Sequence, residues 1–275
     1  YLSYRNFTSI MNVEVAQTTY SIGGQAPTQP CVFASCDSIY FWQHAASFIY
    51  SAATHGNNVH LHLMNPDDGV FTEITRLSHD VDTDVTWSYE FFDLMKSFST
   101  DATRTYYACN RFLRVCDLIN CNSQWDPIGN TDFIILDIDC IVRKKLEFPK
   151  EKIGLFLRPH EQPGMQVAAG IVTLQGIEGY TFIKLVADMI KENKLEWFLD
   201  QHALHHIYTN SPVVDQNRVY KYDINYMDWE FDEERDASIW TGKGPRKDTS
   251  LPYLREKSKY LMQSGITERF WRNSP

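Results

Sequence analysis

The chain alternates between short apolar stretches and longer stretches whose apolar residues recur at helical spacing. Residues 31–36 (CVFASC) form a short apolar run, residues 37–56 show helical periodicity, and residues 59–65 (VHLHLMN) alternate with a period of two. This order predicts a strand, a helix and a second strand, which together form a βαβ unit with a right-handed crossover. The Pro-Asp-Asp-Gly segment at 66–69 predicts the turn that ends the second strand.

Later segments continue the alternation of strands and helices. Further strands are predicted at residues 85–92, 152–159 and 165–179, and further helices at residues 102–119, 181–194, 196–210 and 252–262. This alternation predicts an α/β fold in which helices flank a mixed, mostly parallel sheet within a single domain. The predicted division is a domain at residues 31–248, an N-terminal extension or edge segment at 1–30, and a C-terminal helical tail at 249–275 that could lead to another domain.

One stretch, TDFIILDIDCIV at residues 131–142, combines an apolar run with two carboxylates. Phe133–Leu136 are apolar and lead directly into Asp137-Ile138-Asp139, after which Cys140–Val142 are apolar again. A short run of this kind predicts a strand buried on both faces. Two aspartates at its end either bind a divalent cation, which also bridges phosphate oxygens, or form an ordinary carboxylate pair that faces solvent. The local sequence leaves both interpretations open.

Composition and charge narrow the classes of partner. The 275 residues carry a net charge of -9, which argues against nucleic acid or an acidic membrane as the main partner. No apolar run approaches the ~18 residues of a membrane span, so none is expected. The first ten residues lack a charged start followed by an apolar core, so no signal peptide is expected either. The oligomeric state is left open.

The cysteines and histidines give weaker indications. None of the six cysteines forms a CxxC pair, which argues against structural zinc and favours a reduced, intracellular protein, predicted to be cytoplasmic. His60 and His62 fall on one face of a predicted strand. They are interpreted either as metal ligands or, more commonly for such pairs, as partly covered strand residues.

In the last third of the chain an acidic segment is followed by a basic one. Residues 223–236 carry seven acidic residues and one arginine, whereas residues 243–275 carry eight basic and three acidic residues. The Gly-rich segment 239–248 contains Lys243 and Lys247. Backbone N–H groups and cations of such a loop can bind a diphosphate, and a solvated basic tail is the alternative interpretation.

Taken in order, these features resemble the nucleotide-sugar glycosyltransferases of the GT-A fold, most closely the retaining family of glycogenin and the bacterial lipopolysaccharide galactosyltransferases. The resemblance covers residues 31–247. ILDIDCIV is similar to the DxD strand of that family, which implies that Asp137 and Asp139 bind Mn²⁺ or Mg²⁺ on the donor diphosphate, with Ile138 beside the donor.

Other segments of the resemblance imply further donor contacts. FASCDSIYF resembles the opening strand and turn, which implies donor binding at Ala34, Asp37 and Tyr40, with the aspartate at the uracil edge and the tyrosine stacked on the base. YYACNRFLRVCDLI resembles the segment before the DxD strand and places Arg111 at the donor. VAAGIVTLQ resembles a small-residue strand that approaches the donor at Ala169 and Gly170.

WFLDQHAL resembles the Asp-Gln pair of the family. The resemblance implies that Asp200 holds the transferred sugar or the acceptor and that the amide of Gln201 lies beside the anomeric carbon, so these two are the predicted catalytic residues.

Two departures from the family pattern concern the donor. Ala168 stands where the family has asparagine, which removes a polar contact to the sugar. Around Gly242, Ile239 stands at the histidine that supplies a third metal ligand and Pro245 at the diphosphate lysine. Lys243, Arg246 or Lys247 could still contact the diphosphate, and the third metal ligand is left unassigned.

The resemblance implies a metal-dependent glycosyltransferase that moves a sugar from a nucleoside-diphosphate sugar, of the uridine class, to a glycan or other hydroxyl acceptor with retention. A catalytically silent sugar-nucleotide or glycan-binding module is the alternative, because of the two departures. A phosphohydrolase of the haloacid dehalogenase type is disfavoured, since its DxD strand opens the fold and here more than 130 residues precede Asp137. A sugar nucleotidyltransferase is disfavoured because residues 31–40 lack a Gly-rich, basic signature.

Overall fold

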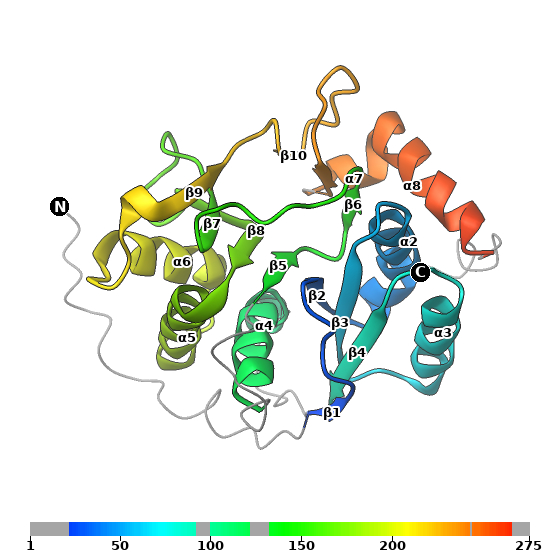
Figure 1. The fold of residues 1–275 in the computed structure, drawn as a ribbon, viewed down its shortest axis with the longest axis horizontal. Helices are drawn as coiled ribbons and strands as arrows, with labels where there is room; N and C mark the ends of the chain where they lie inside the picture. The colour runs from blue at the N-terminus through cyan, green and yellow to red at the C-terminus, as the bar shows by residue number, and fades with distance from the viewer. Residues whose placement is uncertain (1–21, 92–99, 122–131, 243, 266–275) are drawn as a thin grey trace.

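A computed structural model describes residues 22–91, 100–121, 132–242 and 244–265 of the chain. An eight-stranded sheet forms its centre (Figure 1). Its strands lie in the order β1 (Gly23–Gly24), β4 (Val85–Glu90), β3 (Asn58–Met64), β2 (Cys31–Asp37), β5 (Phe133–Leu136), β8 (Val167–Leu174), β7 (Ile153–Leu157) and β9 (Val219–Tyr222). Strands β4, β3, β2 and β5 are parallel, β8 runs antiparallel to its neighbours, and β9 is parallel to β7. The predicted mixed, mostly parallel sheet is therefore confirmed.

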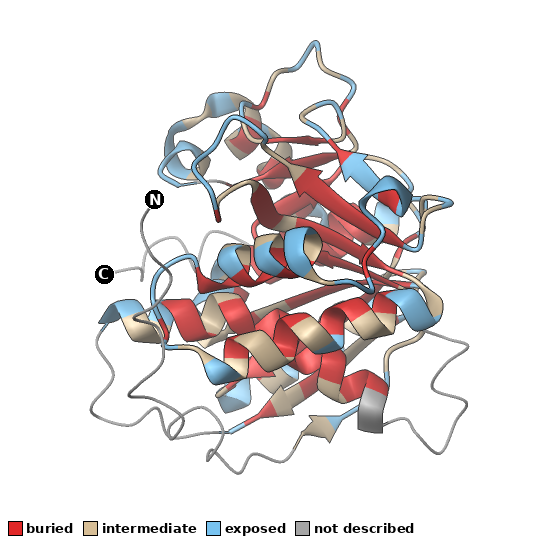
Figure 2. Cartoon of the chain, turned by 90° about the vertical axis from the view of Figure 1, so that its left-hand side faces the viewer, coloured by how far each residue is buried: buried red, intermediate tan, exposed pale blue. Residues whose placement is uncertain are grey.

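Helices cover both faces of this sheet. The helices of one layer are α4 (Thr100–Cys121), α5 (Gly176–Glu192) and α6 (Leu199–Asn210), and those of the other are α2 (Ala46–Thr54) and α3 (Asp68–His79), with α8 (Leu251–Gln263) packed on α2. Successive side chains of β2 point to opposite faces of the sheet. Phe33 packs in the hydrophobic core beneath α4, α5 and α6, whereas Val32 and Ala34 pack in the core beneath α2 and α3. Figure 2 shows the buried strands between helices whose outer sides are exposed. Among the described helices, none has the length and apolar character that crossing a membrane requires.

The predicted strand that ends at the two aspartates is confirmed, and a second strand, which was not predicted, follows them. Phe133–Leu136 form β5 of the main sheet, and β6 (Cys140–Val142) belongs to a three-stranded sheet with β11 (Ile239–Thr241) and β10 (Met227–Asp228). A turn closed by a 3.1 Å hydrogen bond from the N of Cys140 to the O of Asp137 separates them. Because charged side chains are costly inside a sheet, the chain leaves the main sheet where the two aspartates begin.

Other boundaries also differ from the sequence prediction. The helical stretch 37–56 is α1 (Ser38–Tyr40), a π-helix (Phe41–Ala45) and α2, and β8 ends at Leu174 because a turn at Gly176 starts α5. The segment predicted as a Gly-rich loop instead contains β11 and the short helix α7 (Arg246–Thr249). Pairing of β11 with β6 explains its first part, since Ile239 is fully buried there.

His60 and His62 lie in a buried polar network between β3, β4 and α4. The ring nitrogens of His60 are 2.9 Å from the hydroxyls of Thr86 and Ser88, and Nε2 of His62 is 3.4 Å from Oε1 of Glu90. Within the described residues no group of three metal-ligating side chains occurs. The structure thus favours the interpretation of these histidines as buried strand residues.

Candidate functional site

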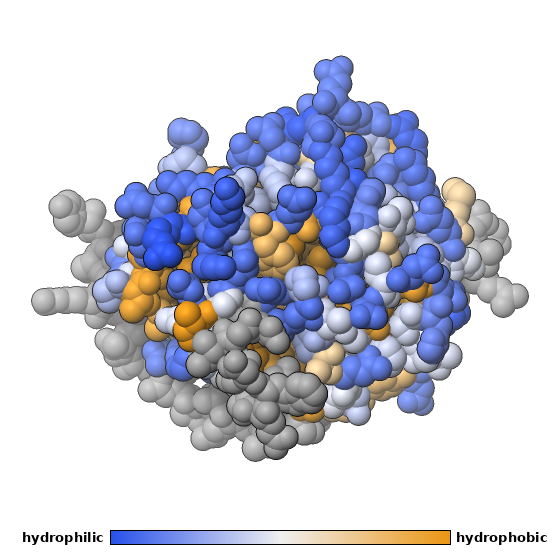
Figure 3. All heavy atoms as spheres, viewed as in Figure 1, coloured by the Kyte–Doolittle hydropathy of each residue, from blue (hydrophilic) through white to orange (hydrophobic). Residues whose placement is uncertain are grey.

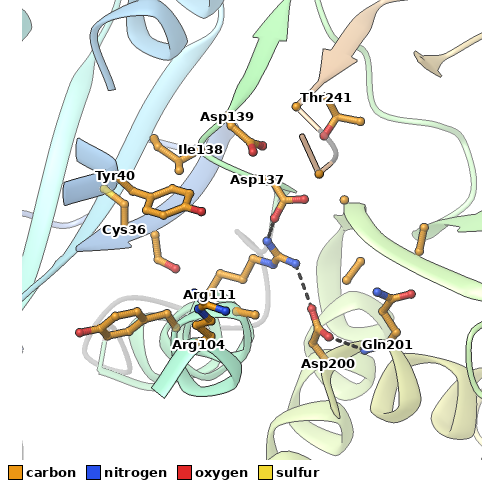
Figure 4. A pocket seen from close by; sticks show the side chains of 18 of the residues that line it. Cys36, Tyr40, Arg104, Arg111, Asp137, Ile138, Asp139, Asp200, Gln201 and Thr241 are labelled. Atoms are coloured by element: carbon orange, nitrogen blue, oxygen red, sulfur yellow. Dashed lines mark hydrogen bonds and ion pairs between the residues drawn. The ribbon is translucent and has the colours of Figure 1, made fainter. Parts of the chain in front are cut away.

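A pocket of about 660 Å³ lies beyond the carboxyl ends of β2 and β5. These two strands are adjacent and parallel, and the chain leaves them towards opposite halves of the sheet. Open α/β sheets bind ligands at such a switch point, because side chains that follow neighbouring strands meet there. Most of the predicted site residues line this pocket (Figure 4). They come from β2, α4, the β5–β6 turn, β8, α6 and α7.

Arg111 joins the two predicted acidic positions of the pocket. Its Nη1 forms an ion pair with Oδ1 of Asp137, and its Nη2 lies 3.2 Å from Oδ2 of Asp200 (Figure 4). One turn further along α4, Arg114 is paired with Glu90 under the sheet at 2.7 Å. The network under β3 and β4 therefore anchors the helix that holds Arg111 in the pocket.

The main chain of Asp139 is held by two donors while its carboxylate faces the pocket. Its carbonyl accepts hydrogen bonds from the hydroxyl of Tyr253 at 2.6 Å and from the N of Gly242 at 3.2 Å. Its Oδ2 lies 2.9 Å from Nζ of Lys247. A Cβ at Gly242 would come within 3.0 Å of Cγ of Asp139, so glycine keeps the space beside this carboxylate open.

Positive charge gathers around Asp139. Burial opposes the charged form of Lys247, but Asp139 outweighs it and raises the pKa of this lysine. Nζ of Lys247 also lies 5.0 Å from the ring centre of Tyr40. Behind them, Nζ of Lys257 is 3.1 Å from Nδ1 of His44, and burial lowers the pKa of Lys257 to about 8.

Asp37 and Tyr40 stand at the end of β2. Oδ1 of Asp37 accepts a 2.8 Å hydrogen bond from the N of Tyr40, which caps α1. The Tyr40 ring is 43% exposed and lines the pocket next to the π-helix, a feature that often occurs at functional sites. Ala34 is fully buried in the core and does not line the pocket, whereas Cys36 does.

The small residues of β8 form part of the pocket wall. Ala168, Ala169 and Gly170 all line it. A Cβ at Gly170 would come within 3.0 Å of Cε of Met227 and 3.5 Å of Oδ2 of Asp137. The bare backbone at this position thus keeps room beside the first aspartate.

Several pocket residues were not predicted from the sequence. On α4 these include Arg104, Tyr107 and Ala108, which line the pocket together with Arg111. Their spacing from Arg111 is the signal that could have found them, because residues three, four and seven positions apart share one face of a helix. The other unpredicted pocket residues include Arg158, Trp197, Phe198, Trp229 and Thr241.

Of the remaining predicted residues, Ile138, Asp200, Gln201 and Lys247 line the pocket. Lys243 lies outside the described residues.

The two aspartates of the β5–β6 turn offer hard oxygen ligands. The described residues contain no group of three metal-ligating side chains, and Ile239, at the position of the third ligand in the resembled family, is fully buried. Mg²⁺ is commonly held by one or two carboxylates together with substrate phosphates rather than by a complete protein cage. The donor set of Asp137 and Asp139 fits that mode of binding, and Gly242 leaves space for it.

By sequence, no family model and no curated protein matches the chain. Solved structures match it in fold. The apo structure of the bifunctional glycosyltransferase WbbM gives a TM-score of 0.52 at 13% identity, over 89% of this chain and 53% of that chain. The apo form of mouse xyloside xylosyltransferase 1 gives 0.45 at 10% identity over 78% and 97%, and the glycosyltransferase GlyE of Streptococcus pneumoniae TIGR4 gives 0.47 at 15% over 85% and 60%.

The match to WbbM concerns the fold alone at this identity, and the chain spans 53% of the length of that protein's chain. With the mixed sheet order described above, the chain has a GT-A-like glycosyltransferase fold, as its resemblance to that class predicted.

Proposed function

We propose that the protein is a metal-dependent glycosyltransferase that moves a sugar from a uridine diphosphate sugar to a hydroxyl group of a glycan acceptor, with retention. The observation that carries the proposal is the convergence of Asp137, Asp139, Arg111 and Lys247 in one pocket at the switch point of the sheet. Carboxylates and cations in close contact are suited to a diphosphate that carries a divalent ion. The pocket volume also falls within the range of about 300–1,000 Å³ typical of ligand pockets.

The proposed donor extends along the pocket from β2 to α6. The base would lie against Tyr40 near Asp37, at the exposed ring that lines the pocket. The diphosphate would lie near Asp139 and Lys247, and the sugar beside Gly170, where the absence of a side chain leaves room.

The chemistry of transfer follows from these contacts. The bond from the sugar carbon to the diphosphate breaks, and the departing oxygen takes the electron pair. Lys247 and Arg111 would stabilise its negative charge, because fixed cations in a pocket act on charge that develops in the transition state. A divalent ion held by Asp137 and Asp139 would supply Lewis-acid stabilisation of the same charge. Asp200, which already faces Arg111, would stabilise the cationic character of the sugar.

An acceptor glycan would approach over Trp197 and Phe198. These side chains line the pocket at 53% and 37% exposure, and their ring centres are 5.2 Å apart. Phe198 adopts a left-handed backbone conformation (φ 71°, ψ 14°), which is strained for a bulky residue, and strain of this kind often occurs at functional sites. On the face drawn in Figure 3, most of the surface is hydrophilic, and apolar areas lie near the middle and at the left. Exposed aromatic rings support a sugar acceptor, whose C–H groups pack against them.

Binding of UDP tests the proposal. Calorimetric titration of the full chain with UDP should show binding in Mn²⁺ that weakens about 10-fold or more in Asp139→Asn, because one charged ligand is lost. Asp188→Asn is the matched control, since it removes a carboxylate paired with Lys184 at 2.7 Å on the surface of α5. Donor hydrolysis with a panel of UDP sugars then tests turnover.

Three results would count against the proposal. UDP binding that is the same in Asp139→Asn and in wild type contradicts the placement of the diphosphate. Release of phosphate from simple phosphoesters would support a phosphohydrolase instead. UDP binding without turnover of any donor would favour the silent binding module, which the buried Ile239 at the third ligand position also supports.

A cytoplasmic location is part of the proposal. Its support is that five cysteines are buried as free thiols in the described part of the chain, and thiols of this kind are typical of reducing compartments.

A further inference from the structure

Arg158, directly after β7, is fixed against the wall of the pocket. Its main-chain N donates to the carbonyl of Gln166 at 2.7 Å, and its Nη2 donates to the carbonyl of Met165 at 2.6 Å. The same Nη2 lies 2.5 Å from Oε1 of Gln201 on α6. The side chain is 10% exposed, and its Nη1 is 3.6 Å from Oε1 of the half-exposed Glu161. A guanidinium held by these partners has little freedom to turn.

This contact decides which way the amide of Gln201 points. A guanidinium carries only donors, so the atom that it contacts must be the amide oxygen. The nitrogen Nε2 is therefore turned away from Arg158, and no described residue accepts a hydrogen bond from it. In Figure 4 this nitrogen lies on the pocket side of Gln201, towards Asp137, and the oxygen lies on the far side.

We propose that Arg158 is a positioning residue that fixes Gln201 as a hydrogen-bond donor to an oxygen of the bound sugar nucleotide. The inference rests on the proposed function. In this orientation the amide oxygen of Gln201 faces Arg158.

A merely structural role of Arg158 gives a different expectation. Arg158 also bonds to Met165 and approaches Glu161, so its removal could simply loosen the loop after β7. Loosening would lower activity whether or not residue 201 carries an amide. If Arg158 acts through Gln201, removing Arg158 has little further effect in a variant that already lacks the Gln201 amide. A double-mutant cycle therefore separates the positioning role from the structural role.

The experiment measures kcat and KM for hydrolysis of the preferred UDP sugar in Mn²⁺, with UDP affinity by calorimetry. Gln201→Glu keeps the oxygen that faces Arg158 and replaces the amide donor, so we expect kcat to fall about 100-fold, as for loss of a transition-state donor. UDP affinity should stay within about 3-fold of wild type, since UDP lacks the transferred sugar and at most a single hydrogen bond is lost. Arg158→Met should lower kcat about 10-fold in wild type and less than about 2-fold in Gln201→Ala. Glu161→Gln, which alters only the exposed partner of Arg158, should leave kcat unchanged.

Each other outcome overturns the inference. Gln201→Glu that retains kcat would show that the amide donor is not needed. Accumulation of a sugar-modified Gln201→Glu protein, detected by mass, would show that the oxygen of residue 201 faces the sugar carbon and not Arg158. Equal losses from Arg158→Met in wild type and in Gln201→Ala would show a structural role. Wild-type protein that neither binds UDP nor hydrolyses any donor overturns the proposed function, and the inference with it.

Discussion

Acid should destabilise the protein through His60, which the fold holds in its neutral form. The side chain is fully buried on β3, stacked on Phe33 with ring centres 5.6 Å apart. Burial, and to a smaller extent the neighbouring His62, lowers the pKa of His60 from 6.5 to about 3. Between these two values the unfolded chain binds a proton that the folded chain does not. The contribution of His60 to the free energy of unfolding is therefore fully present above its pKa in the unfolded chain, and it falls as the pH drops below that pKa.

The size of the effect follows from the unfolded state. At a pH of about 5 the unfolded imidazole is mostly protonated and the folded one remains neutral, so proton binding favours unfolding by RT ln(1 + 10^1.5), about 2 kcal/mol. At a pH of about 7.5 the same expression is close to zero. Because the folded pKa lies well below 5, the result depends little on its value.

Urea unfolding of wild type and His60→Gln at these two pH values measures the effect. Glutamine cannot take up a proton and can still bond to Thr86 and Ser88. We expect wild type to lose about 2 kcal/mol more than the variant between a pH of about 7.5 and about 5. His62 and Glu90 titrate in both proteins, so their contributions largely cancel in the comparison. A difference between the two proteins that is the same at both pH values would refute the reasoning, because His60 would then titrate alike in both states.

Two further substitutions test the buried polar network between β3, β4 and α4 and the exposed aromatic residue Phe198 of the pocket. Glu90→Gln should destabilise the protein by about 3 kcal/mol in urea unfolding, because it removes the fully buried carboxylate of the ion pair and leaves Asp117 as the remaining charged partner of Arg114. Asp188→Asn, in an exposed pair, should cost less than about 1 kcal/mol. An effect of Glu90→Gln as small as that of the control would mean that the buried pair contributes little. Phe198→Gly removes a strained left-handed residue, worth roughly 1–2 kcal/mol, which offsets the lost side-chain contacts. It should therefore destabilise less than Tyr220→Gly at similar exposure, while lowering transfer to a glycan but not donor hydrolysis. If Phe198→Gly and wild type transfer sugar to the glycan at equal rates, Phe198 does not bind the acceptor.

The hydrophobic pattern of the sequence determined most of the elements and the class of fold. Period-two alternation located β3, and helical spacing located most of α5 and α8, because these signals depend only on neighbours along the chain. The apolar run before Asp137 likewise predicted a buried strand that ends at the carboxylates. Positions of the predicted site residues on separate strand ends were enough to expect that they meet at one edge of a sheet.

Tertiary structure alone decided what each charged residue contacts. Arg111 and Arg114 lie one turn apart on α4, and nothing in the local sequence distinguishes them. In the structure Arg111 pairs with Asp137 and Asp200, whereas Arg114 pairs with Glu90. The division of residues 133–142 between two sheets likewise depends on β11, which lies about a hundred positions further along the chain. The direction of the Gln201 amide was equally beyond the sequence, since local patterns carry no information about partners brought close only by folding. Charged and polar groups find those partners across long separations, and that is why their roles required the folded structure.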